Sequence, residues 1–227
     1  MRIRPFVPRV AAVSLVAAAL GVSGCSSGGQ SATGPGNPSG GYDISRIDQL
    51  ANQFPSDFTV TPIPNTTLTQ EQADNFGDMF KKFGIAIDPP QCETTLKSFR
   101  AVANTQLQGL AAKGPQDITV IAMQVPQPFP PSGGDNCSHI TLSASGIQGT
   151  ADRIPGPAIS GATTLGIKEH VNITLPSTSK TLDMYMYIAT FGDKTGVTVT
   201  SQSDKGQSDT KLLDGLLVKG VAAVRGR

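Results

Sequence analysis

The residues best able to do chemistry in this 227-residue chain are three cysteines and two histidines. Thiolates and imidazoles bind metal ions and act as nucleophiles or general bases. Cys92, Cys137 and His139 could together form a metal or redox site. However, Cys137 and His139 do not have the spacing of zinc ligands, and no second pair of such residues supports the site. We therefore expect no metal and no cofactor.

The sequence lacks the motifs of common catalytic machinery. It contains no Gly-x-Ser-x-Gly nucleophile motif and no Gly-x-Gly-x-x-Gly between a strand and a helix. The segment 192–196 contains Lys-Thr without the earlier glycine of a phosphate-binding loop, so we expect a hairpin turn there. His139 and His170 each lie in an expected strand. We expect that the protein is not an enzyme. The alternative is an envelope hydrolase with an atypical site, in which a serine or aspartate meets one of these histidines.

Cys25 stands at the end of a secretory signal. Arginines give the chain a positive start, and the uncharged run 10–22 is shorter than the about 20 residues that span a membrane. The run ends in LGVSGC, which resembles a bacterial lipobox, the signal for lipid attachment to its cysteine. We expect residues 1–24 to be a signal peptide and Cys25 to be the lipidated first residue of the mature chain. An ordinary cleaved signal peptide, with Cys25 incidental, is the alternative.

Residues 25–41 are expected to be the lipidated cysteine and a disordered tether. The segment after Cys25 reads SSGGQSATGPGNPSGG, with no charge and no large apolar side chain to bury. A flexible segment of this length has a reach of about 22 Å. We therefore expect an extracytoplasmic protein, lipid-anchored to the outer face of the cell membrane. Without the signal arginines the chain is slightly acidic, which argues against a nucleic-acid partner.

Cys92 and Cys137 are the cysteines that remain in the exported part of the chain. Disulfides form in extracytoplasmic compartments, and an exported domain with two further cysteines most simply pairs them. We therefore expect a disulfide between Cys92 and Cys137, which the loop-entropy estimate values at about 4 kcal/mol.

Capping residues and apolar spacing predict helices near both ends of residues 42–227. Asp43 is an N-cap residue, and Thr69 with Gln72 forms a capping box. A longer helix is expected from about 93 to 113, and a last helix begins at residue 208 or 209.

The middle of the chain has the pattern of strands. β-branched or alternating runs predict strands over 117–125, 138–145, 165–175, 182–191 and 197–201. Proline-rich segments predict loops at 126–136 and 151–161. Helices, then consecutive strands, then a helix indicate one globular α+β domain over 42–227. We expect an antiparallel β-sheet with helices packed on one face, N-terminal helices and a C-terminal closing helix.

Aromatic residues in one expected strand are a candidate binding surface. Tyr185, Tyr187 and Phe191 could line a face for a lipid or a peptide if no helix covers it. Core packing and cross-strand pairing are the alternative. Glu169 is an acidic residue on an otherwise apolar strand face. It is either a buried functional carboxylate or a residue at a bulge or in a local pair.

The organisation of the chain resembles uncharacterised lipoproteins of mycobacteria and related actinobacteria. The resemblance rests on the lipobox, the Ser/Gly/Pro tether and three segments that precede the expected strands. These segments are Ile44-x-x-Ile47-x-x-Leu50, Phe54-Pro55-x-x-Phe58-x-Val60 and Asp88-Pro89-Pro90-Gln91-Cys92. More distantly, the chain is similar to the extracellular sensor domains of mycobacterial receptor Ser/Thr kinases.

The resemblance implies an antiparallel sheet and brings no catalytic residues with it. We expect a cell-envelope lipoprotein of binding or accessory function. Its expected partners are the membrane, through the lipid anchor, and a small molecule, a lipid or an envelope protein.

Overall fold

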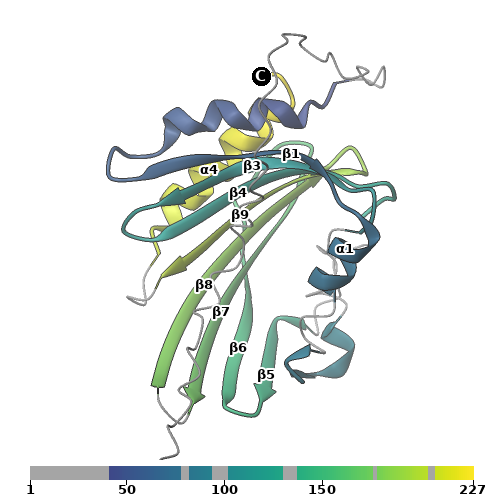
Figure 1. The fold of residues 1–227 in the computed structure, drawn as a ribbon. Coiled ribbons are helices and arrows are strands. Elements are labelled where there is room, and N and C mark those ends of the chain that lie inside the picture. The colour runs from purple at the N-terminus through teal and green to yellow at the C-terminus, as the bar shows by residue number, and fades with distance from the viewer. Residues whose placement is uncertain (1–40, 78–81, 94–101, 130–136, 176–177, 204–207) are drawn as a thin grey trace, which may run out of the picture. The chain divides into compact units, whose positions relative to one another are not determined.

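The computed structural model describes residues 41–77, 82–93, 102–129, 137–175, 178–203 and 208–227 (Figure 1). The predicted signal peptide and all of the predicted tether except residue 41 lie outside these ranges. Among the described residues, none of the helices combines the length and apolar character needed to cross a membrane.

The described residues form a nine-stranded sheet in which every neighbouring pair is antiparallel. The strand order is β1-β3-β4-β9-β8-β7-β6-β5-β2, which confirms the predicted antiparallel sheet. The strands are β1 (Thr59–Thr67), β2 (Ala86–Asp88), β3 (Gln106–Lys113), β4 (Asp117–Gln124), β5 (His139–Ala144), β6 (Ile147–Ile154), β7 (Thr163–Leu175), β8 (Thr178–Phe191) and β9 (Thr195–Ser203).

Three of the four described helices, η1, α1 and α4, begin at the predicted capping residues. They are η1 (Ile44–Gln53), α1 (Gln70–Gly77), η2 (Pro90–Cys92) and α4 (Thr210–Val224), with η1 and η2 of the 3-10 type. The Asp43 carboxylate accepts a hydrogen bond from the Ser45 amide at 3.0 Å. Thr69 and Gln72 form a reciprocal capping box, and Asp209 accepts from the Leu212 amide at 3.1 Å.

The predicted long helix over 93–113 is wrong in its second half. Residues 106–113 form β3, which pairs with β1 on one side and β4 on the other. Leu107 and Leu110 fit a helical period, but pairing with a strand on each side overrides that local preference. Residues 94–101 lie outside the described part. The predicted loop over 151–161 also begins late, because β6 continues to Ile154.

One hydrophobic core lies against the β3-β4-β9-β8 part of the sheet. Opposed residues in neighbouring antiparallel strands point to the same face, and the register places Leu110, Val120, Val199 and Tyr187 side by side. The buried residues of η1 and α4 pack on these side chains, namely Ile44, Ile47, Leu50, Leu213, Leu216, Leu217, Val221, Ala223 and Val224. Gly166 lies opposite Tyr187, and a Cβ there would come within 3.0 Å of the tyrosine ring.

A second core lies on the opposite face, towards β5 and β6. It joins the two cysteines to side chains of β5, β6 and β7, namely Ile140, Leu142, Ala151, Leu165 and Ile167. Leu165 and Ile167 alternate with Gly166, so they face away from the first core. The helical segments therefore contact the sheet from both sides, because Cys92 of η2 belongs to this second core. This arrangement is more divided than the single helical face predicted.

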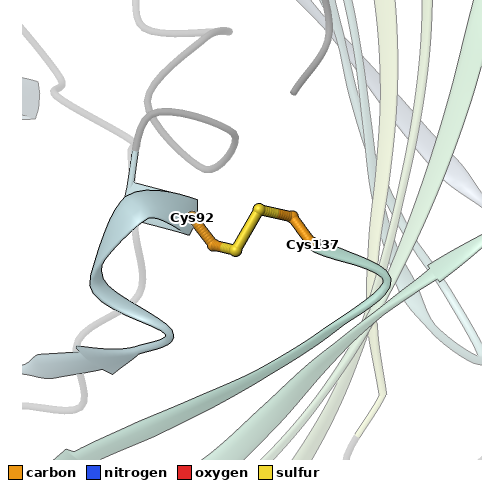
Figure 2. Close-up of a disulfide and its surroundings, with 2 residues drawn as sticks. All are labelled: Cys92 and Cys137. Carbon is orange, nitrogen blue, oxygen red and sulfur yellow. A yellow bond between two sulfur atoms is a disulfide. The ribbon is translucent and has the colours of Figure 1, made fainter. Parts of the chain in front are cut away.

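The predicted disulfide is present between Cys92 and Cys137 (Figure 2). It joins η2 to the residues just before β5, and both cysteines are buried. All buried members of the two cores lie between Ile44 and Val224. A chain of residues 26–227 therefore keeps both cores complete.

Candidate functional site: a polar sheet face

The strand register brings both histidines to the same face of the sheet. His139 of β5 lies opposite Asp152 of β6, which lies opposite Lys168 of β7. His170 follows Lys168 at the next position on that face and lies opposite Asp183 of β8. This is the face that η1 and α4 cover over the other strands. We call His139, Asp152, Lys168, His170, Asn172, Thr181 and Asp183 the polar face.

Each histidine is hydrogen bonded to an aspartate across the strand pair. The Nδ1 atom of His139 lies 2.5 Å from Oδ1 of Asp152, and Nδ1 of His170 lies 2.8 Å from Oδ1 of Asp183. The Asp183 side chain is only 11% exposed, whereas that of His170 is 47% exposed. An aspartate thus meets each histidine, and both imidazoles are well exposed.

An amide and a hydroxyl extend the second pair into a network. The Thr181 hydroxyl donates to Oδ1 of Asn172 at 2.7 Å. Nδ2 of Asn172 lies 3.5 Å from Nε2 of His170. In the neutral tautomer with a proton on Nδ1, the imidazole donates to Asp183 and accepts from Asn172. The network therefore fixes the orientation of four side chains on β7 and β8.

The polar face provides hydrogen-bond donors and acceptors with nearly balanced charge. Two aspartates are paired with imidazoles, and the Lys168 ammonium lies 5.8 Å from the ring centre of Tyr185. The large apolar side chains that are exposed in the described part are Tyr42, Phe83, Val102 and Val218, none of which lies on β5 to β8. Over the same described residues, no group of three His, Cys, Asp or Glu side chains could hold a metal ion. The surface suits a polar ligand better than an acyl chain.

Among the described residues, neither imidazole is hydrogen bonded to a serine or threonine hydroxyl that could act as a nucleophile. The two pairs contain a base and an orienting carboxylate but lack the third member of a nucleophile–base–acid triad.

Comparison with known families assigns the domain. The model of a family described as a domain of unknown function, DUF5642, matches residues 43–225. The chain belongs to the DUF5642 family. The match covers both cores and the polar face of the DUF5642 domain. No functionally curated protein matches the chain.

Two solved structures share features of the DUF5642 domain. An uncharacterised protein of Mycobacterium smegmatis, the Rv0999 ortholog, is 25% identical and aligns with a TM-score of 0.66 over 81% of this chain and 97% of its own. The extracellular domain of PknH from Mycobacterium tuberculosis is 9% identical and aligns with a TM-score of 0.42 over 80% of this chain and 97% of its own.

The aromatic residues predicted as a binding surface do not form one open surface in the DUF5642 domain. Tyr187 and Phe191 are each only 4% exposed and belong to the first core. The ring centres of Phe191 and Tyr42 lie 5.1 Å apart in an edge-on arrangement. The Cζ atom of Arg225 lies 4.7 Å from the ring centre of Phe191. Tyr185 is half-buried beside Lys168. The sequence suggested a surface because alternation cannot tell which face of a strand the helices cover.

Glu169 lies on the face opposite the polar face, with Ala151 and Met184 beside it. The pairing of β7 is regular there, so no bulge explains the residue. Glu169 makes no hydrogen bond or ion pair in the described part of the structure, and burial raises its pKa. Among the described residues, Glu169 is therefore a carboxyl with two apolar neighbours in the sheet and no polar partner.

Asp152 and Asp183 are the site residues that the sequence did not single out. Each is 13 positions from its histidine, and the pairing depends on the register of two strands. Strand alternation placed His170 and Asn172 outward, and a hairpin model joining β7 to β8 could have suggested an acidic residue opposite His170.

Proposed function

We propose that this protein is a cell-envelope lipoprotein whose DUF5642 domain binds a hydroxyl-rich ligand, a saccharide of the envelope, through the polar face. The observation that carries the proposal is the half-exposed network of Thr181, Asn172, His170 and Asp183, with the pair of His139 and Asp152 on the same face.

The chemistry of the polar face matches that of a saccharide. Sugar hydroxyls donate and accept hydrogen bonds at once, and the face offers carboxylate acceptors beside amide, imidazole and ammonium donors. The aspartates already have imidazole partners, so the face does not present isolated charge. Rigid strands hold these groups, which lowers the conformational entropy lost when a ligand binds.

Three sequence and structural features support the location at the envelope. The first 25 residues have the pattern of a lipoprotein signal. The following Ser/Gly/Pro segment would give the domain freedom to reach a wall polymer. The Cys92–Cys137 disulfide fits an oxidising compartment outside the cytoplasm.

Binding to insoluble cell-wall sacculi of an actinobacterium tests the proposal. We expect residues 26–227 to co-sediment with sacculi, and a double variant with His170→Ala and Asn172→Ala to bind about ten-fold more weakly. The matched control is Gln49→Ala with Asn52→Ala, which removes two exposed polar side chains from η1. Circular dichroism and thermal unfolding check that each variant is folded.

The control should bind as the wild type does. Equal binding by both double variants, or no binding by the wild type, would exclude the polar face as a saccharide site. A parallel pull-down from solubilised envelope tests a protein as the alternative ligand. If the wild type captures a protein that only the His170 and Asn172 variant fails to capture, the ligand of the polar face is that protein and not a saccharide.

A hydrolytic role is the second candidate function. The observation in its favour is the imidazole of His170 oriented by the buried carboxylate of Asp183, the arrangement of a general base. The same sacculi report on it. Soluble saccharide released by the wild type and lost in a single His170→Ala variant would show hydrolysis, whereas binding without release supports the binding role.

A further inference from the structure

A cavity of about 410 Å³ lies at the opposite end of β8 from the polar-face network. Its lining residues are Gly41, Tyr42, Ser160, Gly161, Arg225 and Arg227. Three distant segments meet here. The Asp43 amide donates to the Val224 carbonyl at 2.9 Å, which fixes the start of η1 against the end of α4. The 160–161 turn completes the wall.

Arg225 is held in place by neutral groups, and no carboxylate of the described residues pairs with it. Its Nη1 atom donates to the Ser160 carbonyl at 2.6 Å, and Nη2 donates to the Gly161 carbonyl at 2.5 Å. The guanidinium also lies over the Phe191 ring. These partners are neutral, so they orient the guanidinium and leave its positive charge uncompensated.

Two further guanidinium groups lie at or beside the cavity. Arg227 lines it, and its side chain makes no hydrogen bond or ion pair with the described residues. Arg46 packs against Gly226, since a Cβ there would lie 2.0 Å from the Nη1 atom of Arg46. Arg46 pairs with the Asp43 carboxylate at 3.4 Å. By contrast, no carboxylate of the described residues neutralises Arg225 or Arg227.

We propose that this cavity binds a phosphate group. Guanidinium groups form paired hydrogen bonds with phosphate oxygens. Arg225 and Arg227, which have no carboxylate partner among the described residues, both line the cavity. The exposed hydroxyls of Tyr42 and Ser160 add donors. The cavity is also larger than one phosphate ion, which leaves room for the group to which the phosphate is attached.

The phosphate can come from a lipid headgroup or from solution. Gly41 and Tyr42, where the predicted tether ends, line the cavity. If the protein is anchored in the membrane through Cys25, lipid headgroups would lie within reach of the cavity. Only this lipid source rests on the proposed lipid anchor. The phosphate site itself would stand if the polar face bound nothing.

Two probes distinguish the sources in a chain of residues 26–227. Inorganic phosphate is titrated by calorimetry, and vesicles of phosphatidylcholine with or without phosphatidylglycerol are tested by co-sedimentation. Arg227→Gln removes an exposed guanidinium that has no partner among the described residues, and it should weaken the phosphate-dependent binding about ten-fold. Arg225→Lys keeps the charge, loses the fork-shaped contact and should also weaken it. Higher salt should weaken the binding further.

Lys211→Gln is the matched control, because it removes an exposed cation from the first turn of α4, far from the cavity. Binding of inorganic phosphate that Arg227→Gln reduces supports a soluble phosphate ligand. Binding only to anionic vesicles, reduced in the same way, supports a lipid headgroup. Equal effects of Arg227→Gln and Lys211→Gln, or no binding of either probe, would overturn the proposal. Arg227→Gln should leave binding to sacculi unchanged, which separates this test from that of the polar face.

Discussion

Two carboxyl groups are partly buried in positions that disfavour their charged form. Burial raises the pKa of Glu169, which has no partner among the described residues. Burial also raises the pKa of Asp214 on α4, whose Oδ1 atom is buried without a hydrogen bond. Burial and then the charge of Asp214 raise the pKa of Tyr187 in the first core. These positions contrast with Asp183, whose carboxylate has an imidazole partner.

Replacing Glu169 by glutamine is expected to stabilise the domain relative to wild type. The gain should be larger at neutral pH than at acid pH. A folded-state pKa above the unfolded value of about 4.5 means that both states are protonated below that value, and the penalty is absent. As the pH rises through the folded pKa, the wild type loses stability and Glu169→Gln does not. Each 1 kcal/mol should appear as about 2–4 °C in Tm.

Thermal unfolding from about pH 4 to pH 7.5 measures this difference. The exposed Glu71 of α1 provides the control variant Glu71→Gln. A Tm difference between Glu169→Gln and wild type that stays constant over this range would contradict a raised pKa of Glu169.

At the level of elements, each half of the sheet depends on a different covering. η1 and α4 bury one face over β3, β4, β9 and β8. On the opposite face, the second core contains residues of β5, β6 and β7 together with the disulfide. The helices of the first core begin at strong caps, whereas η2 is a three-residue turn fixed by Cys92.

Removing the disulfide is expected to destabilise the domain. The double variant with Cys92→Ser and Cys137→Ser should lose about 2–4 kcal/mol of unfolding free energy, because the unfolded chain gains freedom and two buried sulfurs are replaced by hydroxyls. Urea unfolding of residues 26–227 without reductant measures the change. Reduced wild type is the control and should resemble the variant. A variant with the wild-type midpoint would show that the second core does not need the crosslink.

Local signals were predictable from the sequence and non-local ones were not. Asp43, Thr69 and Asp209 act on amides two or three residues away, so the helix starts could be predicted. The strands β7, β8 and β9 were visible as alternation. β3 was not, because its conformation depends on pairing with β1 and β4. The polar face was not predicted either, since His170 and Asp183 meet through the register of β7 and β8, which residue types and alternation alone do not give.

At the level of the whole molecule, the proposed lipid anchor would hold the domain at the membrane surface. When the full chain is expressed in an actinobacterial host, we expect Cys25 to take up an alkyne-labelled fatty acid and the protein to partition into detergent. Cys25→Ser should abolish both, because the thiol is the attachment point. Cys137→Ser, which removes a different cysteine, should keep the label. An unlabelled wild type in the aqueous phase would instead indicate an ordinary cleaved signal.

β8 also gives the molecule a fixed internal length. Its last residue, Phe191, contacts Tyr42, where the described chain begins to fold, and Asp183 lies eight residues away on the same strand. At about 3.3 Å per residue, these two points are about 26 Å apart. A flexible tether lengthens its reach only as the square root of its residue number, whereas a strand adds distance linearly. The distance between the phosphate cavity and the polar face is therefore fixed by β8, and changes in tether length cannot alter it.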